Sequence, residues 1–244
     1  MGKRISKIVK KIMDSATKEN LQPYLKELLW AETFNSTITD IAWLQNRSFS
    51  PGRWAVGYPG LYILVRTLNE IKPESILEFG LGESSKITSQ YVNGTSNPSA
   101  LRIVEHDENW ISFFCKNYSQ LKVTDKIMQF RLGESVVDKE KSTIYKGLLK
   151  GISDRKYDFV IIDGPFGSDS FSRPQILDII KADLLMKNFV ILFDDAEREG
   201  EQQTIKSIKL LLEQKGIDFA YGKYTGMKDT DIICSKDYQF LISL

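Results

Sequence analysis

Acidic residues follow two apolar segments of this 244-residue chain and are its first candidates for chemistry. "YDFVIIDGPFG" contains Asp163, and "NFVILFDDAERE" contains Asp194, Asp195 and Arg198. At the ends of parallel strands, the three carboxylates would converge and repel one another unless a proton, a cation or a substrate ammonium compensates. Mg²⁺ typically takes one or two carboxylates plus waters and substrate oxygens. We therefore predict Asp163, Asp194, Asp195 and Arg198 as catalytic residues, and the three aspartates as candidate ligands if a divalent cation is the compensating charge.

The stretch "ILEFGLGESS", residues 76–85, leads from another apolar run into a turn with two glycines. Gly80 and Gly82 permit a tight turn and a close approach of the backbone to a ligand. The dinucleotide-binding pattern GxGxxG would need a third glycine where this chain has Ser85. Glu78, before the glycines, would repel a pyrophosphate but suits a ligand that carries an ammonium and a sulfonium. We therefore predict S-adenosylmethionine as the cofactor.

The same stretch resembles motif I of the class I methyltransferases, an acid followed by GxG, with Ser84 where a third glycine often stands. In that family an acid at the end of the second strand holds the ribose hydroxyls. Glu105 in "LRIVEHDENW" lies 25 residues after Gly80 and takes this role. His106, the only histidine, is either a local hydrogen-bonding group or a general base.

Two further segments complete the predicted cofactor site. "RLGES" takes the place of the family's adenine-side motif, so Glu134 and Ser135 are expected near the adenine amino group. In "GRWAVGYPG", Trp54 and Tyr58 either flank the sulfonium, because an aromatic face attracts a cation, or pack within a loop. The predicted cofactor-binding residues are Trp54, Tyr58, Glu78, Gly80, Leu81, Gly82, Ser84, Ser85, Glu105, His106, Glu134, Ser135 and Asp163.

The strand-end acids are also similar to those of the catechol-type O-methyltransferases. In that family, an acid after the fourth strand and an acidic or amide pair after the fifth hold Mg²⁺ against two substrate hydroxyls. The resemblance implies a metal-dependent enzyme for a small hydroxylated metabolite. This chain has Phe166 where that family has its general-base lysine, so the resemblance assigns no base.

A second resemblance, to the glucuronoxylan methyltransferases, covers about forty residues. Their pattern is D-A-P-x-G, a later P-G-R-M segment and H-D-V-D-R-x-V-E. The matching positions here are Asp163, Pro165, Gly167, Asp195, Arg198 and Glu201, while Asp194 replaces the histidine. The resemblance implies a sugar hydroxyl as acceptor, with Arg198 or Arg173 free to pair with a uronic acid carboxylate. Alternatively, Asp195 or Glu197 caps the helix that begins near Glu199.

The elements that must position these residues alternate along the chain. Strands are expected at Ser75–Phe79, Leu101–Glu105, Ile127–Leu132, Tyr157–Asp163 and Asn188–Asp194. Helices are expected at Leu61–Ile71, Ser84–Tyr91, Asn109–Tyr118, Arg173–Leu185 and Glu199–Gly216. This alternation predicts a Rossmann-like α/β fold whose mostly parallel sheet has helices on both faces. After Gly216, "IDFAYGKY", "TDIICS" and "YQFLISL" are expected to be antiparallel strands.

The first fifty residues are predicted to be a helical extension, and residues 51–244 the methyltransferase domain. Residues 1–30 form an amphipathic pattern in which lysines surround an isoleucine-rich face. Such a helix packs on its own domain, contacts a second subunit or lies on an anionic membrane surface.

Composition restricts the class of protein. The formal net charge of +1 argues against a nucleic acid partner, and the two cysteines do not form a disulfide framework. Since the sequence has no membrane-spanning stretch, we expect a cytoplasmic protein. The resemblances above imply that its acceptor is a carbohydrate or another small molecule. A non-catalytic binding subunit with the same fold is an alternative, and an NAD-dependent oxidoreductase is disfavoured by Glu78 and Ser85.

Overall fold

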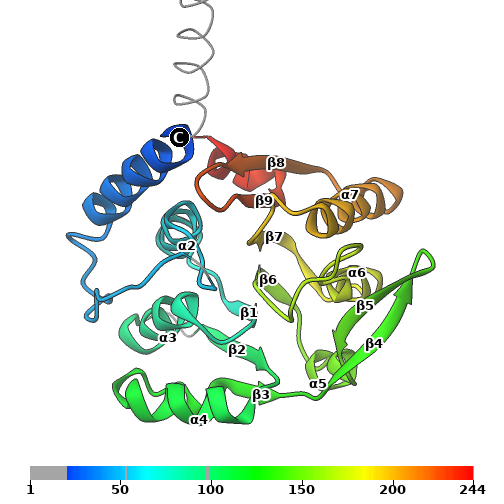
Figure 1. Cartoon of the computed structure of the whole chain (residues 1–244), viewed down its shortest axis with the longest axis horizontal. Coiled ribbons are helices and arrows are strands. Elements are labelled where there is room, and N and C mark those ends of the chain that lie inside the picture. Colours follow the sequence, from blue (N-terminus) through cyan, green and yellow to red (C-terminus); the bar gives the residue numbers. More distant parts are fainter. Residues whose placement is uncertain (1–20, 53, 97–98, 244) are drawn as a thin grey trace, which may run out of the picture.

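The computed structural model describes residues 21–52, 54–96 and 99–243. Its centre is a seven-stranded sheet with the strand order β3-β2-β1-β6-β7-β9-β8 (Figure 1). The strands are β1 Ser75–Phe79, β2 Ala100–Glu105, β3 Ile127–Gln129, β6 Tyr157–Ile162, β7 Leu185–Phe193, β8 Phe219–Tyr224 and β9 Thr230–Ser235. β3, β2, β1, β6 and β7 pair in parallel, and β9 is antiparallel to both of its neighbours. This arrangement confirms the predicted fold class.

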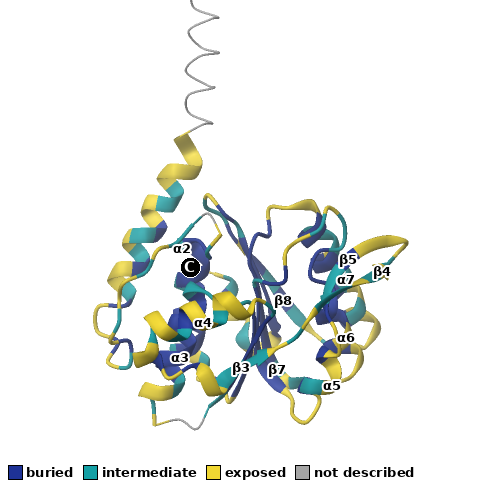
Figure 2. Ribbon diagram, turned by 60° about the horizontal axis from the view of Figure 1, so that its bottom comes forward, coloured by how far each residue is buried: buried dark blue, intermediate teal, exposed yellow. Residues whose placement is uncertain are grey.

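Two layers of helices cover the sheet, which Figure 2 shows nearly edge-on. One layer contains α2 Tyr58–Ile71, α3 Glu83–Gly94 and α4 Glu108–Asn117, and the other contains α5 Leu148–Ile152, α6 Gln175–Lys181 and α7 Glu199–Gln214. Every residue of β1 and β6 is buried. Strands covered on both faces are nearly continuous apolar runs, which is why "SILEF" and "YDFVII" do not alternate with polar residues.

The strand order reverses between β1 and β6. From β1 the chain proceeds to β2 and β3 on one side, whereas β6 is followed by β7 on the other side. The connections after β1 and after β6 therefore leave in opposite directions and open a crevice beyond the carboxyl ends of these strands. Ligands of open α/β sheets bind in such a crevice.

A hairpin that the sequence did not predict follows β3. The expected strand Ile127–Leu132 is too long, because β3 ends at Gln129, and Leu132 begins the antiparallel pair β4 Leu132–Val137 and β5 Glu140–Tyr145. The turn residues Asp138 and Lys139 have left-handed backbones, with φ of 50° and 74°. Two left-handed central residues suit the tight turns that match the twist of hairpin strands.

The expected last strand, "YQFLISL", is wrong. Lys236–Ile242 forms the 3₁₀ segment η3. Leu241 is fully buried, and a Cβ added to Gly222 of β8 would lie 2.8 Å from Cβ of Ile242. Leu241 and Ile242 thus pack against the sheet without pairing with its edge, while Phe240 stays 40% exposed.

A helix over residues 21–37 precedes this domain, and residues 1–20 of the predicted amphipathic helix lie outside the described residues. Trp30 and Phe34 are buried in the same hydrophobic cluster as the core residues of α2. The outer face is apolar and more than half exposed at Leu21, Tyr24, Leu25, Leu28 and Leu29. Within the described part of the chain, no helix is both long and apolar enough to cross a membrane.

Candidate active site

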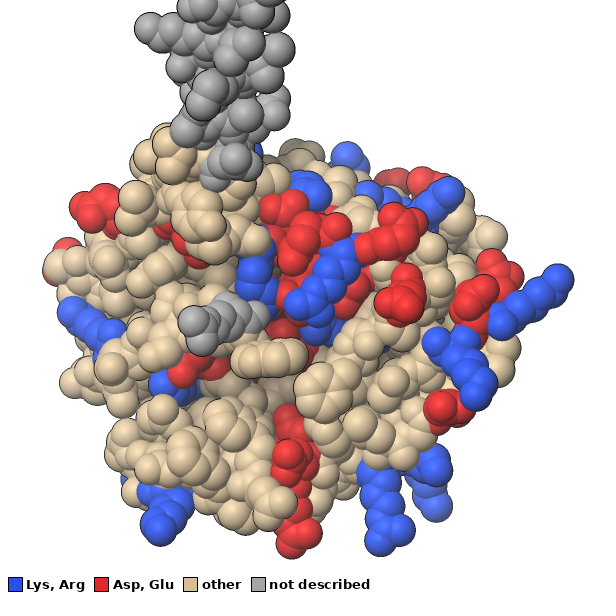
Figure 3. All heavy atoms as spheres, in the orientation of Figure 1, with Lys and Arg blue, Asp and Glu red and all other residues tan. Residues whose placement is uncertain are grey.

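A cavity of about 480 Å³ lies at the carboxyl ends of β1, β2, β6 and β7. It is lined by Ser50, Trp54, Ala55, Gly80, Leu81, Gly82, Glu83, Glu105, His106, Asp107, Trp110, Phe114, Tyr118, Tyr145, Asp163, Gly164, Pro165, Phe166, Gly167, Arg173, Asp195 and Arg198. Acidic and basic side chains gather in one patch near the centre of the face shown in Figure 3. The volume falls within the range of about 300 to 1,000 Å³ typical of small-molecule sites.

The glycine turn forms one wall of the cavity. Gly80 has a left-handed backbone with φ of 93°, and a Cβ built there would lie 2.8 Å from the carbonyl oxygen of Asp163. The close approach of the β1 and β6 ends therefore requires glycine at this position. A Cβ built on Gly82 meets nothing within 4 Å, so its backbone is open to a ligand.

Glu78 is not among the residues that line the cavity. The structure therefore does not place Glu78 against the cofactor, contrary to the prediction from the sequence. Its buried carboxylate accepts hydrogen bonds from the hydroxyls of Ser84 at 2.6 Å, Ser85 at 2.8 Å and Thr88 at 2.6 Å. Burial raises its pKa, although these three hydrogen bonds oppose the shift. Glu78 points towards α3 because successive strand residues face opposite sides of the sheet. It joins β1 to the first turns of α3 and positions the glycine loop indirectly.

Glu105 lies on the cavity wall at the end of β2. Its Oε2 accepts a hydrogen bond from Leu81 N at 3.1 Å, and its Oε1 accepts from His106 N at 2.6 Å and Asp107 N at 2.9 Å. His106 Nδ1 lies 2.7 Å from Oε1 of the same carboxylate. A carboxylate offers about two lone-pair sites on each oxygen, and Oε2 has only the contact from Leu81 N, so the remaining acceptor capacity of Glu105 lies on Oε2.

Helix α4 closes the cavity beside Glu105. The Asp107 carboxylate caps α4 by accepting hydrogen bonds from Asn109 N at 2.8 Å and Trp110 N at 3.0 Å. The Trp110 indole Nε1 donates to Leu81 O at 2.6 Å and fixes the helix against the glycine turn. The aromatic ring of Trp110 thus forms part of the wall.

Asp163, Asp194 and Asp195, which we call the three-aspartate cluster, come together as predicted, with one carboxylate oxygen of each within 4.8 Å of the others. Three cationic side chains surround them. Lys228 Nζ lies 2.7 Å from Asp194 Oδ2 and 2.7 Å from Asp195 Oδ1. Asp195 Oδ2 is 2.9 Å from Arg173 Nη2 and 3.0 Å from Arg198 Nη1. The mutual repulsion expected from the sequence is therefore compensated by the protein itself.

The surroundings shift the pKa values of Asp163 and Asp195 in opposite directions. Burial and the neighbouring Asp194 raise the pKa of Asp163 well above its ordinary value, although Arg173 and Lys228 oppose the shift. Burial also opposes ionisation of Asp195, but Arg173, Lys228 and Arg198 outweigh it and lower the pKa of Asp195. For the Lys228 ammonium, the three aspartates outweigh burial and raise its pKa. Lys228 therefore stays charged at neutral pH.

The two arginines of this region differ in availability. Arg173 donates to Pro165 O at 3.2 Å, Asp194 O at 3.0 Å and Asp195 Oδ2 at 2.9 Å, and it is buried. Three of its five N–H donors are thus used within the protein, so Arg173, although it lines the cavity, is less available to a carboxylate than the sequence suggested. The Arg198 side chain is 48% exposed and reaches the cavity, so it remains available for an anionic group.

Two residues beside the three-aspartate cluster have an unusual backbone conformation. Asp195 and Arg173 have left-handed backbones, with φ of 58° and 57°. Such conformations cost free energy in non-glycine residues and cluster at functional sites. The N-cap of α7 is Arg198, without a side-chain cap, so Asp195 and Glu197 do not cap this helix as the alternative interpretation expected.

Several predicted residues lie away from the cavity. Glu134 and Ser135 are on the outer hairpin, where Glu134 pairs with Lys141 at 3.0 Å and is 70% exposed, so the predicted adenine contact is wrong. Tyr58 packs towards Phe34 with ring centroids 6.0 Å apart. The remaining predicted residues outside the described lining are Glu78, Ser84, Ser85 and Asp194.

Other residues of the site carried no sequence signal. Lys228 lies in the loop between β8 and β9 and reaches an aspartate 34 positions earlier in the chain. Its type and spacing match no motif. Tyr145 reaches the cavity from the end of the unpredicted hairpin strand β5. Tertiary folding alone brings these side chains to the rim.

No family model matches this sequence, and no curated protein sequence matches it either. The structure resembles an O-methyltransferase from Bacillus cereus in complex with SAH (S-adenosylhomocysteine), with 14% identity, coverage of 91% of this chain and 97% of that one, and a TM-score of 0.51.

An SAH-bound methyltransferase from Podospora anserina is 16% identical, with coverage of 91% and 96% and a TM-score of 0.51. An O-methyltransferase of Streptomyces achromogenes, in complex with SAM and involved in tomaymycin synthesis, is 12% identical, with coverage of 86% and 89% and a TM-score of 0.50. Likenesses at such low identity concern the fold. The chain therefore has the Rossmann-like fold of the class I S-adenosylmethionine-dependent methyltransferases.

Proposed function

We propose that this chain is an S-adenosylmethionine-dependent O-methyltransferase. The observation that carries the proposal is the cavity wall formed by the Gly80–Gly82 turn and the Glu105 carboxylate at adjacent strand ends. The open backbone at Gly82 suits a ligand that approaches closely, and the acceptor capacity of Glu105 suits a vicinal diol such as that of a ribose. The fold likeness to proteins bound to SAH or SAM supports the same ligand class.

In this proposal, Glu105 holds the ribose hydroxyls, and His106 and Trp110 form the wall beside the nucleoside. The glycine turn accommodates the amino acid end of the cofactor, and Asp163 borders the cavity beside it. Trp54, which is 87% exposed, lies at the cavity mouth. When bound, the cofactor supplies an electrophilic methyl group.

Asp163 is the proposed general base. Its side chain is 16% exposed and borders the cavity, and its nearest described cation, Arg173 Nη2, is 3.7 Å from Oδ1. Its raised pKa increases its affinity for the proton of an acceptor hydroxyl. The pKa of Asp195 is lowered instead, because Arg173 and Lys228 stabilise its ionised form. Pairs of neighbouring acids whose surroundings push their pKa values apart are typical of acid–base catalysis.

The proposed acceptor is a sugar hydroxyl of a glycan or glycoconjugate that carries a carboxylate. Arg198 reaches the cavity with part of its guanidinium exposed, and such a group binds carboxylates bidentately. Phe166 is 64% exposed at the same cavity and offers an apolar surface to the body of the acceptor. The matches of Asp163, Pro165, Asp195 and Arg198 to the glucuronoxylan pattern support this class.

A metal-dependent methyltransferase for a catechol-like metabolite is the second candidate. The spacing of the three-aspartate cluster favours it, because three carboxylate oxygens within 4.8 Å are close enough to share one cation. It predicts that EDTA abolishes activity. The first candidate predicts that EDTA has no effect.

We further propose that the helix over residues 21–37 contacts a membrane surface or a second subunit through its exposed Leu21, Leu25, Leu28 and Leu29. Contact with a lipid-linked sugar at a cytoplasmic membrane face would give this surface a purpose. Free Cys115 and Cys234 are consistent with a reducing compartment. Liposome flotation of the wild type and of a variant with Leu21, Leu25, Leu28 and Leu29 replaced by Ser tests the membrane form of this proposal.

Calorimetry with S-adenosylhomocysteine and with NAD is the first experiment. Binding of S-adenosylhomocysteine alone supports the proposal, and binding of NAD alone overturns it. Methyl transfer from labelled S-adenosylmethionine is then measured with uronic acid glycosides and with catechols. A chain that binds S-adenosylhomocysteine but methylates neither acceptor class would be a binding subunit or act on another acceptor.

A further inference from the structure

Lys228 occupies a position in the three-aspartate cluster that neither the glycine turn nor the strand-end motifs indicate. Its ammonium lies 2.7 Å from Asp194 Oδ2 and 2.7 Å from Asp195 Oδ1, and it donates to Ala55 O at 2.9 Å. Of its three donor protons, two are donated to Asp194 Oδ2 and Ala55 O, and Asp195 Oδ1 is held as an ion pair. The side chain is only 10% exposed.

The oxygens that meet the ammonium are the oxygens that a divalent ion would need. A Mg²⁺ ion requires ligand oxygens at about 2.0 to 2.1 Å in octahedral geometry. Asp194 and Asp195 each direct one oxygen at Nζ, and the second oxygen of Asp195 faces Arg173 and Arg198. An ion that uses the two oxygens facing Nζ must therefore displace Lys228 and leave a buried ammonium without its partners, which is costly.

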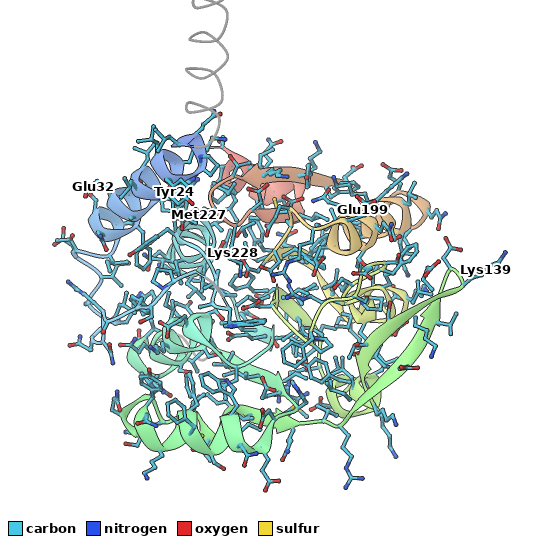
Figure 4. All side chains as sticks on the ribbon, viewed as in Figure 1. Tyr24, Glu32, Lys139, Glu199, Met227 and Lys228 are labelled. Atoms are coloured by element: carbon cyan, nitrogen blue, oxygen red, sulfur yellow. The ribbon has the colours of Figure 1, made fainter. Side chains whose placement is uncertain are left out.

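The backbone of the Lys228 loop is held from both sides, so Lys228 starts from a fixed position next to the cluster. Met227 N donates to Glu27 Oε2 at 2.9 Å, and the other oxygen of Glu27 accepts from Tyr58 N at 3.0 Å. On the opposite side, Asp229 N donates to Glu197 Oε2 at 2.8 Å. Figure 4 shows Met227 and Lys228 in succession between the N-terminal helix and the middle of the molecule.

We propose that the Lys228 ammonium is the resident cation of the three-aspartate cluster and that this chain binds no divalent ion there. The three cationic partners of Asp194 and Asp195, which are Lys228, Arg173 and Arg198, are thus supplied by the chain itself, and the oxygens that face Lys228 do not fit a metal while Lys228 is present. Lys228 lies outside the described cavity lining, so it is a positioning residue that orients the aspartates. This inference concerns metal binding and does not depend on the identity of the acceptor.

Titration with Mn²⁺, followed by electron paramagnetic resonance of the free ion, tests the inference without an activity assay. We expect the wild-type protein to bind no stoichiometric Mn²⁺. Lys228→Met removes the charge but keeps a similar volume, so this variant should bind one Mn²⁺ at least tenfold more tightly than the wild type. Adding Asp194→Asn to that variant should abolish the site.

Lys223→Met is the matched control. Lys223 pairs with Asp229 at 2.9 Å near the same loop but does not contact the cluster, so its loss should leave the titration unchanged. Stoichiometric Mn²⁺ binding by the wild type would overturn the inference, and this result needs no folded variant. Equal Mn²⁺ affinity in a correctly folded Lys228→Met protein and the wild type would also overturn it.

Discussion

Replacing Asp163 by Asn separates catalysis from cofactor binding and from folding. The substitution keeps the shape of the side chain but removes its ability to accept a proton. The Asp163 side chain makes no close ion pair with a described residue, since its contact with Arg173 Nη2 is 3.7 Å long. Arg173 keeps its 2.9 Å pair with Asp195 in the variant, so no buried charge loses its main partner.

The expected magnitudes follow from these contacts. Loss of a general base lowers the rate by about 10²- to 10⁴-fold, which corresponds to about 3 to 5 kcal/mol of transition-state stabilisation. The free energy of unfolding should change by about 1 kcal/mol or less, because the contact with Arg173 is long. The affinity for S-adenosylhomocysteine should stay within about threefold of the wild type, since the Glu105 wall is intact.

The assay measures kcat at saturating S-adenosylmethionine, together with calorimetric binding of S-adenosylhomocysteine and thermal unfolding. Asp138→Asn is the matched control, because Asp138 lies in the exposed turn of the hairpin and Asn tolerates its left-handed backbone. A fully active Asp163→Asn variant would refute the assignment of the base. A variant that loses binding and activity together would show that Asp163 holds the cofactor.

The raised pKa of Asp163 also predicts a pH dependence. The folded protein keeps the Asp163 proton at pH values where the unfolded chain has lost it. The stabilisation from this group is fully present below the ordinary carboxyl pKa of about 4 and is lost as pH rises through the pKa of the folded protein. Activity should rise over the same upper range, since the base must be ionised. Asp163→Asn should remove this group's contribution to the pH dependence of stability.

Two further substitutions, each compared with a matched control variant, test the cofactor wall. Glu105→Ala should weaken S-adenosylhomocysteine binding by about 1.5 to 3 kcal/mol, the range for a hydrogen bond to a charged group, whereas Glu134→Ala on the exposed hairpin should not, and calorimetry compares them. Gly80→Ala should lower the free energy of unfolding by more than about 1 kcal/mol, because φ is 93° and the new Cβ would lie 2.8 Å from Asp163 O. Gly82→Ala has open space around its Cβ and should fold with nearly wild-type stability in the same denaturant titration. Similar destabilisation of both glycine variants would contradict the role given to the Gly80 conformation.

Much of the fold was predictable because its determinants are local. Continuous apolar runs identified β1 and β6, and their alternation with helical segments predicted a parallel sheet. The parallel direction then required Gly80, Glu105, Asp163 and Asp195 to meet at one rim, which they do. The hairpin β4–β5 and the 3₁₀ segment η3 were not predicted, because a short apolar run does not reveal which surface will bury it.

The sequence by itself determined the sheet, the glycine turn and the convergence of carboxylates at the carboxyl ends of the strands. Tertiary structure alone decided which of these groups face the cavity. Glu78 faces α3 instead of the ligand because its side chain points to the α3-covered side of β1. Glu134 is exposed because it lies on the β4–β5 hairpin, away from the cavity. Lys228 reaches Asp194 from a loop distant in sequence. Only packing in three dimensions places that ammonium among the aspartates, because no local spacing encodes a contact between separate strands.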